Sequence, residues 1–485
     1  MPRPGSIHES NFVDCETVPA FGFRIVDLSA NDAEEGSIRR MKICVLGCGY
    51  VGLVTSAVFS DMGNDVICVD IDEKRIKDLQ SGECPIFEPG LPEVLSRNTQ
   101  EKRLEFSTST AHGVEQSEII FICVGTPPKD GGETDLSQVE SAARAIAKSL
   151  NGHKIIVNKS TVPVGTGDFV RKVIEEYRGG NGSFDVVSNP EFLREGQALS
   201  DSLHPDRIVI GASSEESAAR LLELYRPWDS TVFVTDILSA EIIKYASNAF
   251  LATKISFINA VANLCEVSGA DVAEVAKGVG ADKRIGSSFI DAGLGYGGSC
   301  FPKDIDSLIH MAEKYGTGFG LLQEVVDINE NRIERFVDRI IERVGAGGDN
   351  PLSGKTIAIL GLAFKPETDD MREAKSVPLC NKLLKAGAKL QAYDPISMEN
   401  AKKVMGEKNI EYCRGAVAAA QGADAVVVVT EWREFIQLDL GRIRDALKDP
   451  ILFDGRNIYV PEQVAQEGIE YHCIGRGPTL PNQRG

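Results

Sequence analysis

The sequence predicts an α/β protein in which two Rossmann-like, doubly wound parallel sheets are joined by a central helical domain with one long helix. Three observations predict this fold. Short apolar runs alternate with helical segments from residue 41 to residue 236, a pattern typical of a parallel sheet. A stretch without Gly or Pro covers Ile237–Ser268, longer than the usual globular helix. The alternation restarts after a Gly-rich linker at 345–351.

A chain of 485 residues is too long for one hydrophobic core. We expect an N-terminal extension at 1–40, a first Rossmann domain at 41–236, a central helical domain at 237–344 and a second Rossmann-like domain at 345–485. The extension has several acids, few bases and no apolar core segment, which argues against a secretory signal or a transit peptide. We expect it to be flexible, apart from one short element at Phe21–Leu28.

Composition narrows the classes of function. The formal net charge of −19 argues against nucleic acid and anionic membrane as partners, because the summed field repels polyanions. No apolar run reaches the roughly 18 residues that span a bilayer. The 11 cysteines are dispersed without any Cys-x-x-Cys pair, which indicates a reduced, cytoplasmic protein without a disulfide framework. The six histidines show no metal-binding spacing, so we expect no metal site.

The first clear strand, from Lys42 to Leu46, leads into the run Gly47-Cys48-Gly49-Tyr50-Val51-Gly52. A helical segment from Leu53 to Met62 and a second strand that ends at Asp70 follow. Strand, glycine turn, helix, strand and acid in this order form the dinucleotide-binding fingerprint. The first glycine makes the turn, the second lets the backbone approach the pyrophosphate, and the third allows helix and strand to pack. Asp70 favours NAD over NADP because it can hold the ribose hydroxyls, although nearby Arg75 leaves some room for NADP.

Several later strands of this domain end in polar clusters. In open α/β sheets, ligands bind at the carboxyl ends of strands, so these clusters favour one shared site. Each cluster taken alone would also suit an ordinary turn. The expected strands are Glu118–Val124, Lys154–Lys159, Asp185–Ser188, Arg207–Gly211 and Thr231–Thr235, with helices at Gln138–Leu150 and Ser217–Tyr225 among them. The clusters are Gly125-Thr126-Pro127-Pro128, Ser160-Thr161-Val162-Pro163 and Asn189-Pro190-Glu191-Phe192-Leu193-Arg194-Glu195-Gly196.

The long helix carries two polar residues on one face. Lys244 and Asn248 are four positions apart and therefore neighbours on the helix surface. A solvated polar stripe is the default explanation for such a pair. The apolar residues around Lys244 favour a second explanation, in which a partly buried lysine lies in a cleft.

A glycine-rich stretch, Gly293-Leu294-Gly295-Tyr296-Gly297-Gly298-Ser299-Cys300-Phe301-Pro302-Lys303-Asp304, follows the long helix. Glycines let a backbone fold tightly against a ligand. A thiol presented from such a loop, close to Lys303 and Asp304, is a candidate nucleophile. The alternative is that Cys300 is a small buried hydrophobe, as most free cysteines are.

The last third of the chain predicts a second, smaller sheet. Its expected strands lack a Gly-x-Gly-x-x-Gly turn, so it should bind something other than a dinucleotide. Gly354-Lys355-Thr356 is no P-loop, because position 349 is Asp and the run precedes a strand. Lys365, Arg372 and Arg456 stand after strands and could bind phosphates or carboxylates. The strands are Thr356–Leu360, Leu390–Tyr393, Asp424–Thr430 and Ile451–Phe453.

From Met41 to Val460 the chain closely resembles the UDP-glucose/GDP-mannose 6-dehydrogenase family. An ordered set of specific motifs carries the resemblance. Phe301 and the run Asp282-Lys283-Arg284-Ile285-Gly286 are similar to the UDP-glucose branch of the family. The motifs are Val124-Gly125-Thr126-Pro127, Ser160-Thr161-Val162-Pro163, the run from Asn189 to Gly196, the run from Gly295 to Asp304, Gly361-Leu362-Ala363-Phe364-Lys365 and Asp454-Gly455-Arg456-Asn457.

The resemblance implies oxidation of the C6 alcohol of a nucleotide sugar, UDP-glucose, to a carboxylate with two NAD+. An aldehyde carbon cannot give up a second hydride until it carries a nucleophile, and Cys300 would add to form a thiohemiacetal and then a thioester. Lys244 and Asn248 would stabilise the oxyanion-like states. The resemblance also implies that Thr161 and Asp304 position a water molecule and that Glu191 assists thioester hydrolysis.

The same resemblance implies two sets of binding residues and a homodimer or higher homo-oligomer. The arginine that matches Arg284 reaches in from a second subunit, and the long helix forms the dimer contact. For NAD the set is Gly47, Gly49, Tyr50, Val51, Gly52, Asp70, Arg75, Thr126, Thr161, Glu195, Lys303 and Arg372. For the nucleotide sugar it is Glu191, Phe192, Leu193, Lys244, Asn248, Arg284, Phe289, Tyr296, Gly297, Phe364, Lys365 and Arg456.

Three alternatives compete with this hypothesis. The same chemistry could act on GDP-mannose or another nucleotide sugar. A two-electron dehydrogenase of the β-hydroxyacid type has a related fold, but its reaction needs no thiol, so Cys300 argues against it. A catalytically idle nucleotide-sensing module is disfavoured because every expected catalytic position is filled.

Overall fold

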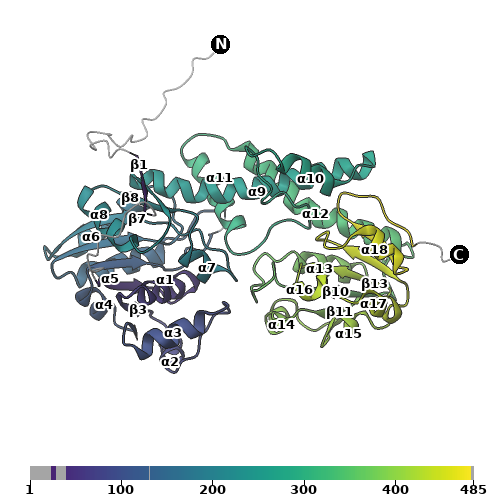
Figure 1. Cartoon of the computed structure of the whole chain (residues 1–485), viewed down its shortest axis with the longest axis horizontal. Coiled ribbons are helices and arrows are strands. Elements are labelled where there is room, and N and C mark those ends of the chain that lie inside the picture. Colours follow the sequence, from purple (N-terminus) through teal and green to yellow (C-terminus); the bar gives the residue numbers. More distant parts are fainter. Residues whose placement is uncertain (1–22, 29–39, 130, 482–485) are drawn as a thin grey trace, which may run out of the picture.

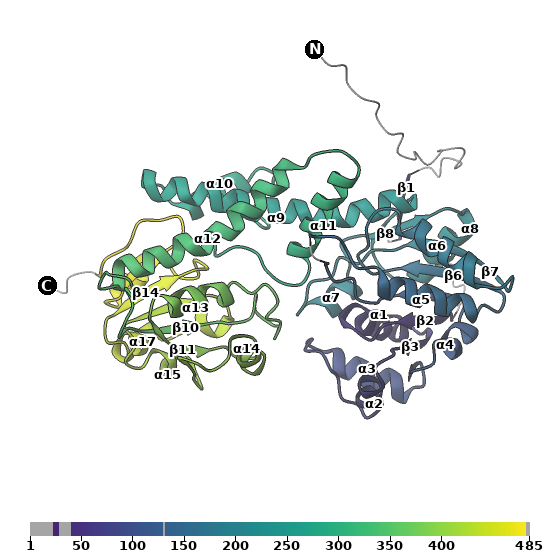
Figure 2. The same ribbon diagram turned by 180° about the vertical axis from the view of Figure 1, so that it is seen from behind.

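The computed structural model describes residues 23–28, 40–129 and 131–481. They form two β-sheets flanked by helices, and a central group of helices joins the two lobes (Figure 1). Seen from behind, the long helices α9 (Ile237–Ser268) and α12 (Gly320–Val344) extend across the top of the molecule (Figure 2). The predicted fold class is confirmed, whereas the domain boundaries near residues 40, 236 and 344 stay predictions.

The sheet of the first lobe has the strand order β1-β9-β8-β7-β6-β5-β2-β3-β4. Because β2 lies between β5 and β3, the order reverses at β2, and this is where an open α/β sheet binds its ligand. The strands are β1 (Arg24–Asp27), β2 (Lys42–Leu46), β3 (Asp65–Val69), β4 (Leu104–Ser107), β5 (Ile119–Ile122), β6 (His153–Asn158), β7 (Ser183–Ser188), β8 (Ile208–Ala212) and β9 (Thr231–Thr235). The helices are α1 (Tyr50–Asp61), α2 (Glu73–Gln80), α3 (Leu91–Gln100), α4 (Thr110–Gln116), α5 (Ser137–Lys148), α6 (Thr166–Tyr177), α7 (Ala198–Leu203) and α8 (Glu215–Tyr225).

One edge of this sheet departs from the predicted parallel pattern. Strands β2 to β7 run parallel, but β8 pairs antiparallel with β7, and β1 pairs antiparallel with β9. A parallel pair needs a full crossover, usually an α-helix. The chain between β7 and β8 instead follows an irregular path with the six-residue α7. The chain therefore enters β8 in the direction opposite to β7. The apolar pattern of β8 does not reveal this strand direction.

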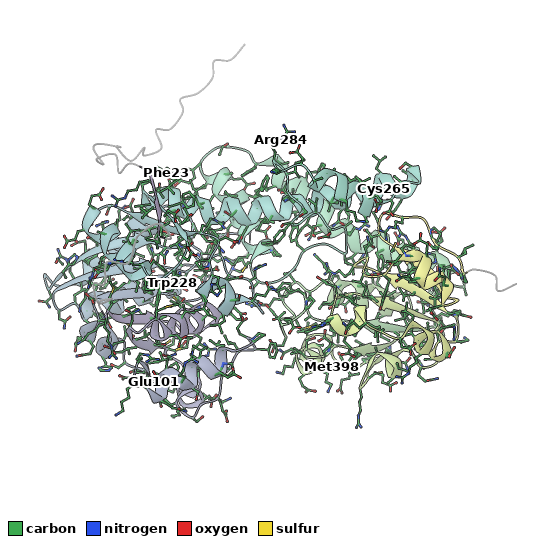
Figure 3. All side chains as sticks on the ribbon, viewed as in Figure 1. Phe23, Glu101, Trp228, Cys265, Arg284 and Met398 are labelled. Carbon is green, nitrogen blue, oxygen red and sulfur yellow. The ribbon has the colours of Figure 1, made fainter. Side chains whose placement is uncertain are left out.

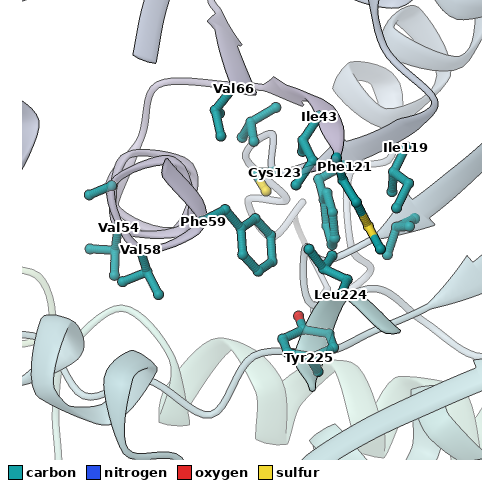
Figure 4. Close-up of a cluster of buried hydrophobic side chains, with 14 of the residues drawn as sticks. Ile43, Val54, Val58, Phe59, Val66, Ile119, Phe121, Cys123, Leu224 and Tyr225 are labelled. Atoms are coloured by element: carbon teal, nitrogen blue, oxygen red, sulfur yellow. The ribbon is translucent and has the colours of Figure 1, made fainter. Parts of the chain in front are cut away.

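The core of the first lobe lies between α1 and the central strands. Phe59 of α1 packs against Phe121 of β5, with ring centroids 5.0 Å apart, and against Tyr225 at 5.8 Å (Figure 4). Strand β5 is buried along its whole length. This explains why its sequence is a continuous apolar run instead of an alternating one.

The long helix α9 spans the residues that the sequence predicted. The Asp236 side chain caps its start by accepting a hydrogen bond from the Ser239 amide, and Gly269 ends it in a left-handed conformation. By length and composition α9 could cross a membrane. Glu241, Lys244 and Asn248 are nevertheless buried within the protein, and α9 packs against α12 and α11 (Phe301–Lys314). We therefore interpret α9 as a core helix of this fold. The remaining helix of the central group is α10 (Val272–Gly280).

The second sheet is parallel throughout, with the order β12-β11-β10-β13-β14-β15. Two of its strands, β12 and β15, and strand β4 of the first sheet were not predicted. The strands are β10 (Thr356–Leu360), β11 (Lys389–Tyr393), β12 (Ile410–Tyr412), β13 (Ala425–Val428), β14 (Ile451–Asp454) and β15 (Glu470–Cys473). The helices are α13 (Ser376–Lys385), α14 (Met398–Met405), α15 (Ala416–Ala420), α16 (Arg433–Ile436), α17 (Leu440–Ala446) and α18 (Pro461–Gln466).

Part of the N-terminal extension is ordered. Residues 24–27 form β1 on the edge of the first sheet, within the short element predicted at Phe21–Leu28. The predicted flexibility of the extension falls otherwise on residues 1–22 and 29–39, which lie outside the described residues. The ten cysteines of the described part are free thiols.

We predict that Gly211→Ala destabilises the contact between β8 and α9. A Cβ at this position would lie 2.5 Å from the Ala240 Cβ and 2.8 Å from the Asp236 carbonyl oxygen. Overpacking of this kind costs about 1–3 kcal/mol, so the midpoint of thermal unfolding should fall. Gly278→Ala in α10 is the matched control, because its Cβ meets open space and alanine is the better helix former by about 1 kcal/mol. Equal midpoints for the two variants would contradict this packing.

Candidate active site

The turn between β2 and α1 has the backbone of a dinucleotide cradle. Gly47 has a φ of +104°, and a Cβ there would lie 2.7 Å from the Cys123 carbonyl oxygen. A Cβ on Gly52 would lie 1.8 Å from the Gly47 carbonyl oxygen. A Cβ on Gly49 would meet no atom within 4 Å. The first and third glycines are therefore required by packing, whereas Gly49 keeps open the surface that a pyrophosphate would approach.

The helix that follows can receive an anion. Gly49 caps α1 without a side-chain hydrogen bond, and the first turn contains no acid. Tyr50 and Val51 are the first residues of α1. The free amides at this end and the positive end of the helix dipole therefore face the glycine turn. Asp70, just after β3, accepts a hydrogen bond from the Cys48 amide at 2.7 Å, and its Oδ2 lies 3.4 Å from Nη1 of Arg75. The structure therefore places Asp70 and Arg75 beside the cradle, and this donor set fits a dinucleotide.

The polar segments after β5, β6 and β7 meet at the carboxyl edge of the sheet. The Thr126 hydroxyl donates to the Thr161 carbonyl oxygen at 2.9 Å and so joins two of them. The Tyr50 hydroxyl hydrogen-bonds with Glu88 and accepts from the Gly196 amide at 2.7 Å, which ties the cradle to the third segment. The predicted shared edge is therefore present in the structure.

The glycine loop is wedged between the central helices and the second lobe. A Cβ on Gly295 would lie 2.3 Å from the Asn329 side chain of α12. On Gly297 it would lie 2.1 Å from the Glu373 carbonyl oxygen, and on Gly298 2.6 Å from the Phe364 ring. No larger residue fits at these three positions without displacing its neighbours. Cys300 then stands at the N-terminus of α11, where the helix dipole favours a thiolate.

A buried ion pair lies next to the thiol. Nζ of Lys244 in α9 is 2.9 Å from Oε1 of Glu191, and the side chains are 4% and 6% exposed. Burial opposes the charge on Lys244, but Glu191, Cys300 and Asp304 together raise its pKa. Burial likewise favours neutral Glu191, but Lys244 and the Leu193 amide, which donates at 2.6 Å, lower its pKa. Both groups are therefore charged near neutral pH.

The thiol itself is neutral at rest. Burial and the Glu191 carboxylate raise the pKa of Cys300, and Lys244 offsets part of this effect. Asn248, one turn after Lys244, donates to Oδ2 of Asp304 at 2.6 Å. Lys303 donates to Oδ1 of Asp304 at 2.6 Å, and Asp304 is fully buried. Lys244, Glu191 and Asp304 therefore act electrostatically on the Cys300 thiol, and Asp304 is itself paired with Asn248 and Lys303.

Glu195 links the first lobe to the second lobe and to the cysteine loop. Its Oε1 accepts from the Ser299 hydroxyl at 2.8 Å and lies 3.2 Å from Nη2 of Arg372. Burial and neighbouring Asp370 raise the pKa of Glu195 to about 7. Tyr50, Glu195 and Arg372 line one groove of about 700 Å³, which brings together three residues predicted to bind NAD.

The second lobe supplies cations and an aromatic ring. Nε of Arg456 donates to the Val429 carbonyl oxygen at 2.8 Å, and its Nη1 reaches the Gly295 carbonyl oxygen at 3.3 Å. Lys365 lies over the Phe364 ring at 5.4 Å, and burial lowers the pKa of Lys365. Arg456 and Phe289 line a pocket of about 480 Å³ beside the glycine loop. Phe289 adopts a φ of +66°, which is rare for an aromatic residue.

The remaining predicted sugar-binding residues lie in three different places. Arg207 and Lys244 both approach the Phe192 ring, at 3.8 Å and 5.4 Å from its centroid, and Leu193 follows Phe192 in the chain. Tyr296 is buried in the core of the central region, and its amide donates to Oδ1 of Asn329 at 2.8 Å. Arg284 is separate: its side chain is 89% exposed and pairs with Asp282 of the same loop. It lies on the outer surface of the central region (Figure 3).

Three residues of the site were not singled out from the sequence. Ser299 contacts both Glu195 and Cys300. Asp370 hydrogen-bonds Arg372. Lys159, at the end of β6, donates to Oδ1 of Asn189 at 3.1 Å, and burial lowers its pKa. Two of these residues could have been found from the sequence. Ser299 places a hydroxyl directly before the thiol, and Lys159 ends an apolar strand.

Comparison with known proteins agrees with this geometry. Residues 41–229 match the NAD binding domain of the UDP-glucose/GDP-mannose dehydrogenase family, 238–331 match its central domain and 358–461 match its UDP binding domain. A UDP-glucose 6-dehydrogenase of Bacillus subtilis is 48% identical over 91% of this chain and 99% of its own length. One of Rhizobium meliloti is 48% identical over 90% of this chain and its full length.

Solved structures show the same architecture. A UDP-glucose dehydrogenase from Pyrobaculum islandicum has a TM-score of 0.83 at 39% identity and covers 90% of this chain and 98% of its own. A UDP-D-ManNAc dehydrogenase from Pyrococcus horikoshii has a TM-score of 0.79 at 29% identity, with 90% and 99% covered. The chain therefore belongs to the UDP-glucose/GDP-mannose dehydrogenase family and is an NAD-dependent dehydrogenase.

Proposed function

We propose that the protein oxidises UDP-glucose to UDP-glucuronate in two successive two-electron steps, through a thiohemiacetal and a thioester on Cys300. The observation that carries this proposal is the placement of Cys300 beside the buried Lys244–Glu191 pair. The two similar bacterial relatives are named UDP-glucose 6-dehydrogenases. A two-electron oxidation of an alcohol would need no thiol at this position, whereas an oxidation to the acid does.

NAD+ would take up a hydride from C6 in each of the two steps, and the β2–α1 cradle would hold it. Lys244 and Asn248 would stabilise the negative charge that develops on the C6 oxygen, because both are buried donors on one helix face. We propose that Asp304 and Thr161 orient a water molecule for proton transfer in these steps. Ionised Glu191 would then help water to cleave the thioester.

The nucleotide sugar would lie against the second lobe. Arg456 and Phe289 line the pocket beside the glycine loop, and an arginine can bind phosphate through two hydrogen bonds. The Phe364 ring packs against Gly297 and Gly298 of that loop, and Lys365 lies over this ring. A related structure is a UDP-D-ManNAc dehydrogenase, so the same chemistry on another nucleotide sugar is the alternative to UDP-glucose.

The first prediction concerns stoichiometry. We expect the wild type to form two NADH for each UDP-glucose, and to form little NADH with GDP-mannose or UDP-N-acetyl sugars. Cys300→Ser should stop formation of the acid, because the aldehyde carbon then lacks its sulfur nucleophile. Cys84→Ser, which changes a partly buried cysteine outside the described site, is the control. Acid formation by Cys300→Ser at the wild-type rate would exclude the covalent route.

The second prediction separates hydrolysis from oxidation. Glu191→Gln should slow release of the acid by a factor on the order of 10²–10⁴, while both hydride transfers still occur. Intact-protein mass spectrometry after mixing with UDP-glucose and NAD+ should then find one UDP-glucuronyl group bound to the chain. The double variant Glu191→Gln/Cys300→Ser is the control and should carry none. A slow single variant that accumulates no adduct would rule out this role for Glu191.

We also propose that the protein is a homodimer with Arg284 acting across the interface. Phe250, Phe257 and Leu264 are seven residues apart on α9, and they are 66%, 56% and 65% exposed. Residues at this spacing share one helix face, and an exposed apolar patch of this kind marks an interaction site. Arg284 points away from the site of its own chain, as a residue that serves a neighbouring subunit would.

The third prediction tests this assembly. Arg284→Ala and Cys300→Ser should each be impaired alone, but dimers reassembled from an equal mixture should regain activity. In a mixed dimer one site has an intact Cys300 from one chain and Arg284 from the other. If Arg284 served its own chain, no site would be complete and the mixture would stay impaired. Separately, Phe257→Asp should yield monomers by light scattering, whereas Val460→Asp, at a 49% exposed position of the second lobe, should not.

A further inference from the structure

Ser299 lies between the thiol of Cys300 and the carboxylate of Glu195. Its Oγ is 2.8 Å from Oε1 of Glu195 and 3.5 Å from Sγ of Cys300. An ionised carboxylate only accepts hydrogen bonds, so the Ser299 hydroxyl donates to Glu195. The serine oxygen is then left to accept from the Cys300 thiol. A continuous chain of hydrogen bonds therefore leads from sulfur to carboxylate.

The proposed covalent route requires the thiol to lose a proton. Burial raises the pKa of Cys300, so the thiol is neutral before it attacks. The thiolate is the nucleophile. Lys244 and the start of α11 can stabilise the thiolate, but they cannot take up the proton. The raised pKa of Lys244 keeps this amine protonated.

The other two carboxylates near the sulfur are engaged. Glu191 binds Lys244 with one oxygen and the Leu193 amide with the other, and these contacts lower its pKa. Asp304 accepts from Asn248 and Lys303 with its two oxygens. Glu195 is paired with Arg372, but burial and Asp370 outweigh this pairing and raise its pKa to about 7. A group of this kind both accepts and returns a proton near neutral pH.

We propose that Ser299 and Glu195 form a proton relay that deprotonates Cys300 during attack and reprotonates it during hydrolysis. This inference rests on the proposed function, which it extends by assigning the proton acceptor for the thiol. It gives Glu195 a role beyond contact with NAD, and it gives Ser299 a role that glycine or alanine could not fill.

The relay balances as follows. When sulfur bonds to C6 of the aldehyde, the S–H bond breaks and its proton goes to Oγ of Ser299. The hydroxyl proton of Ser299 moves to Oε1 of Glu195, and the aldehyde oxygen gains the negative charge. During hydrolysis the oxygen of a water molecule bonds to C6, and one proton of that water passes through Glu191 to solvent. The C6–S bond breaks, the leaving sulfur takes a proton from Ser299, and Glu195 returns its proton to Ser299. The second proton of the water leaves when the product acid ionises, so the relay is restored with water as the only added reactant.

Charged groups from several elements face this relay. Asp370 and Arg372 of the second lobe contact Glu195 directly, so their charge sets its proton affinity. Arg372 and Lys365 also act on both Glu195 and Cys300 through space. Among the described residues, the groups that act on Glu195 or Cys300 include Tyr50, Glu191, Lys244, Asp304, Lys365, Asp370 and Arg372.

The test uses the full-length protein without NAD or substrate. We would measure the rate at which iodoacetamide alkylates Cys300 as a function of pH, following the Cys300 peptide by mass spectrometry. In the wild type the rate should rise up to about pH 7, where Glu195 becomes ionised, and then level off until the thiol itself ionises. Ser299→Ala and Glu195→Gln should lack this plateau and rise about tenfold for each pH unit. At pH 7 the two variants should be slower by a factor on the order of 10².

Ser299→Thr is the rescue variant, because it keeps the hydroxyl and should keep the plateau. Alkylation of Cys84 is the control for local folding and should be unchanged in all variants, and a cooperative thermal unfolding transition should show that each variant is folded. A wild type without a plateau, or a Ser299→Ala variant that retains it, would overturn the relay. The alkylation rates are measured without NAD or substrate and do not depend on the number of NADH formed. The relay can therefore be disproved while the proposed function holds, and the proposed function can be disproved while the relay holds.

Discussion

The ion pair between Lys244 and Glu191 is the interaction on which the site depends. Removing a charged group from water costs several kcal/mol, and the pair is stable only if further hydrogen bonds satisfy it. Here the Leu193 amide binds the second oxygen of Glu191. The pair joins the N-terminal part of α9 to the segment after β7 and lies beside the thiol. Loss of either partner would leave an uncompensated charge next to Cys300. The same ion pair therefore both connects α9 to the segment after β7 and balances the charge around the thiol.

The glycine loop depends on this arrangement and on the second lobe. Its glycines are fixed from three directions: Asn329 of α12, the Glu373 backbone and the Phe364 ring. Arg456 adds a hydrogen bond from the second lobe to the Gly295 carbonyl oxygen. Sulfur is therefore held where the two lobes and the central helices meet. A dinucleotide in the first lobe and a nucleotide sugar against the second could both reach that point.

Much of this was accessible from the sequence because the responsible patterns are local. The strand–glycine–helix–acid order predicted the cradle, and the absence of Gly and Pro predicted α9 with both ends correct. The spacing of Lys244 and Asn248 placed them on one face, although it could not show that both are buried. Antiparallel β8 was missed because an apolar strand reads the same in either direction. The contacts of Ser299 and Arg372 with Glu195 arise between segments far apart in the chain, and no local pattern encodes them.

The covalent role of Cys300 can be measured directly. The wild type would be mixed with NAD+ and UDP-glucose labelled at C6, and the reaction would be stopped with acid during turnover and digested. Label on the peptide that contains Cys300, released by hydroxylamine as expected for a thioester, is the result that we predict. Formation of labelled UDP-glucuronate with no label on that peptide at any time would contradict it.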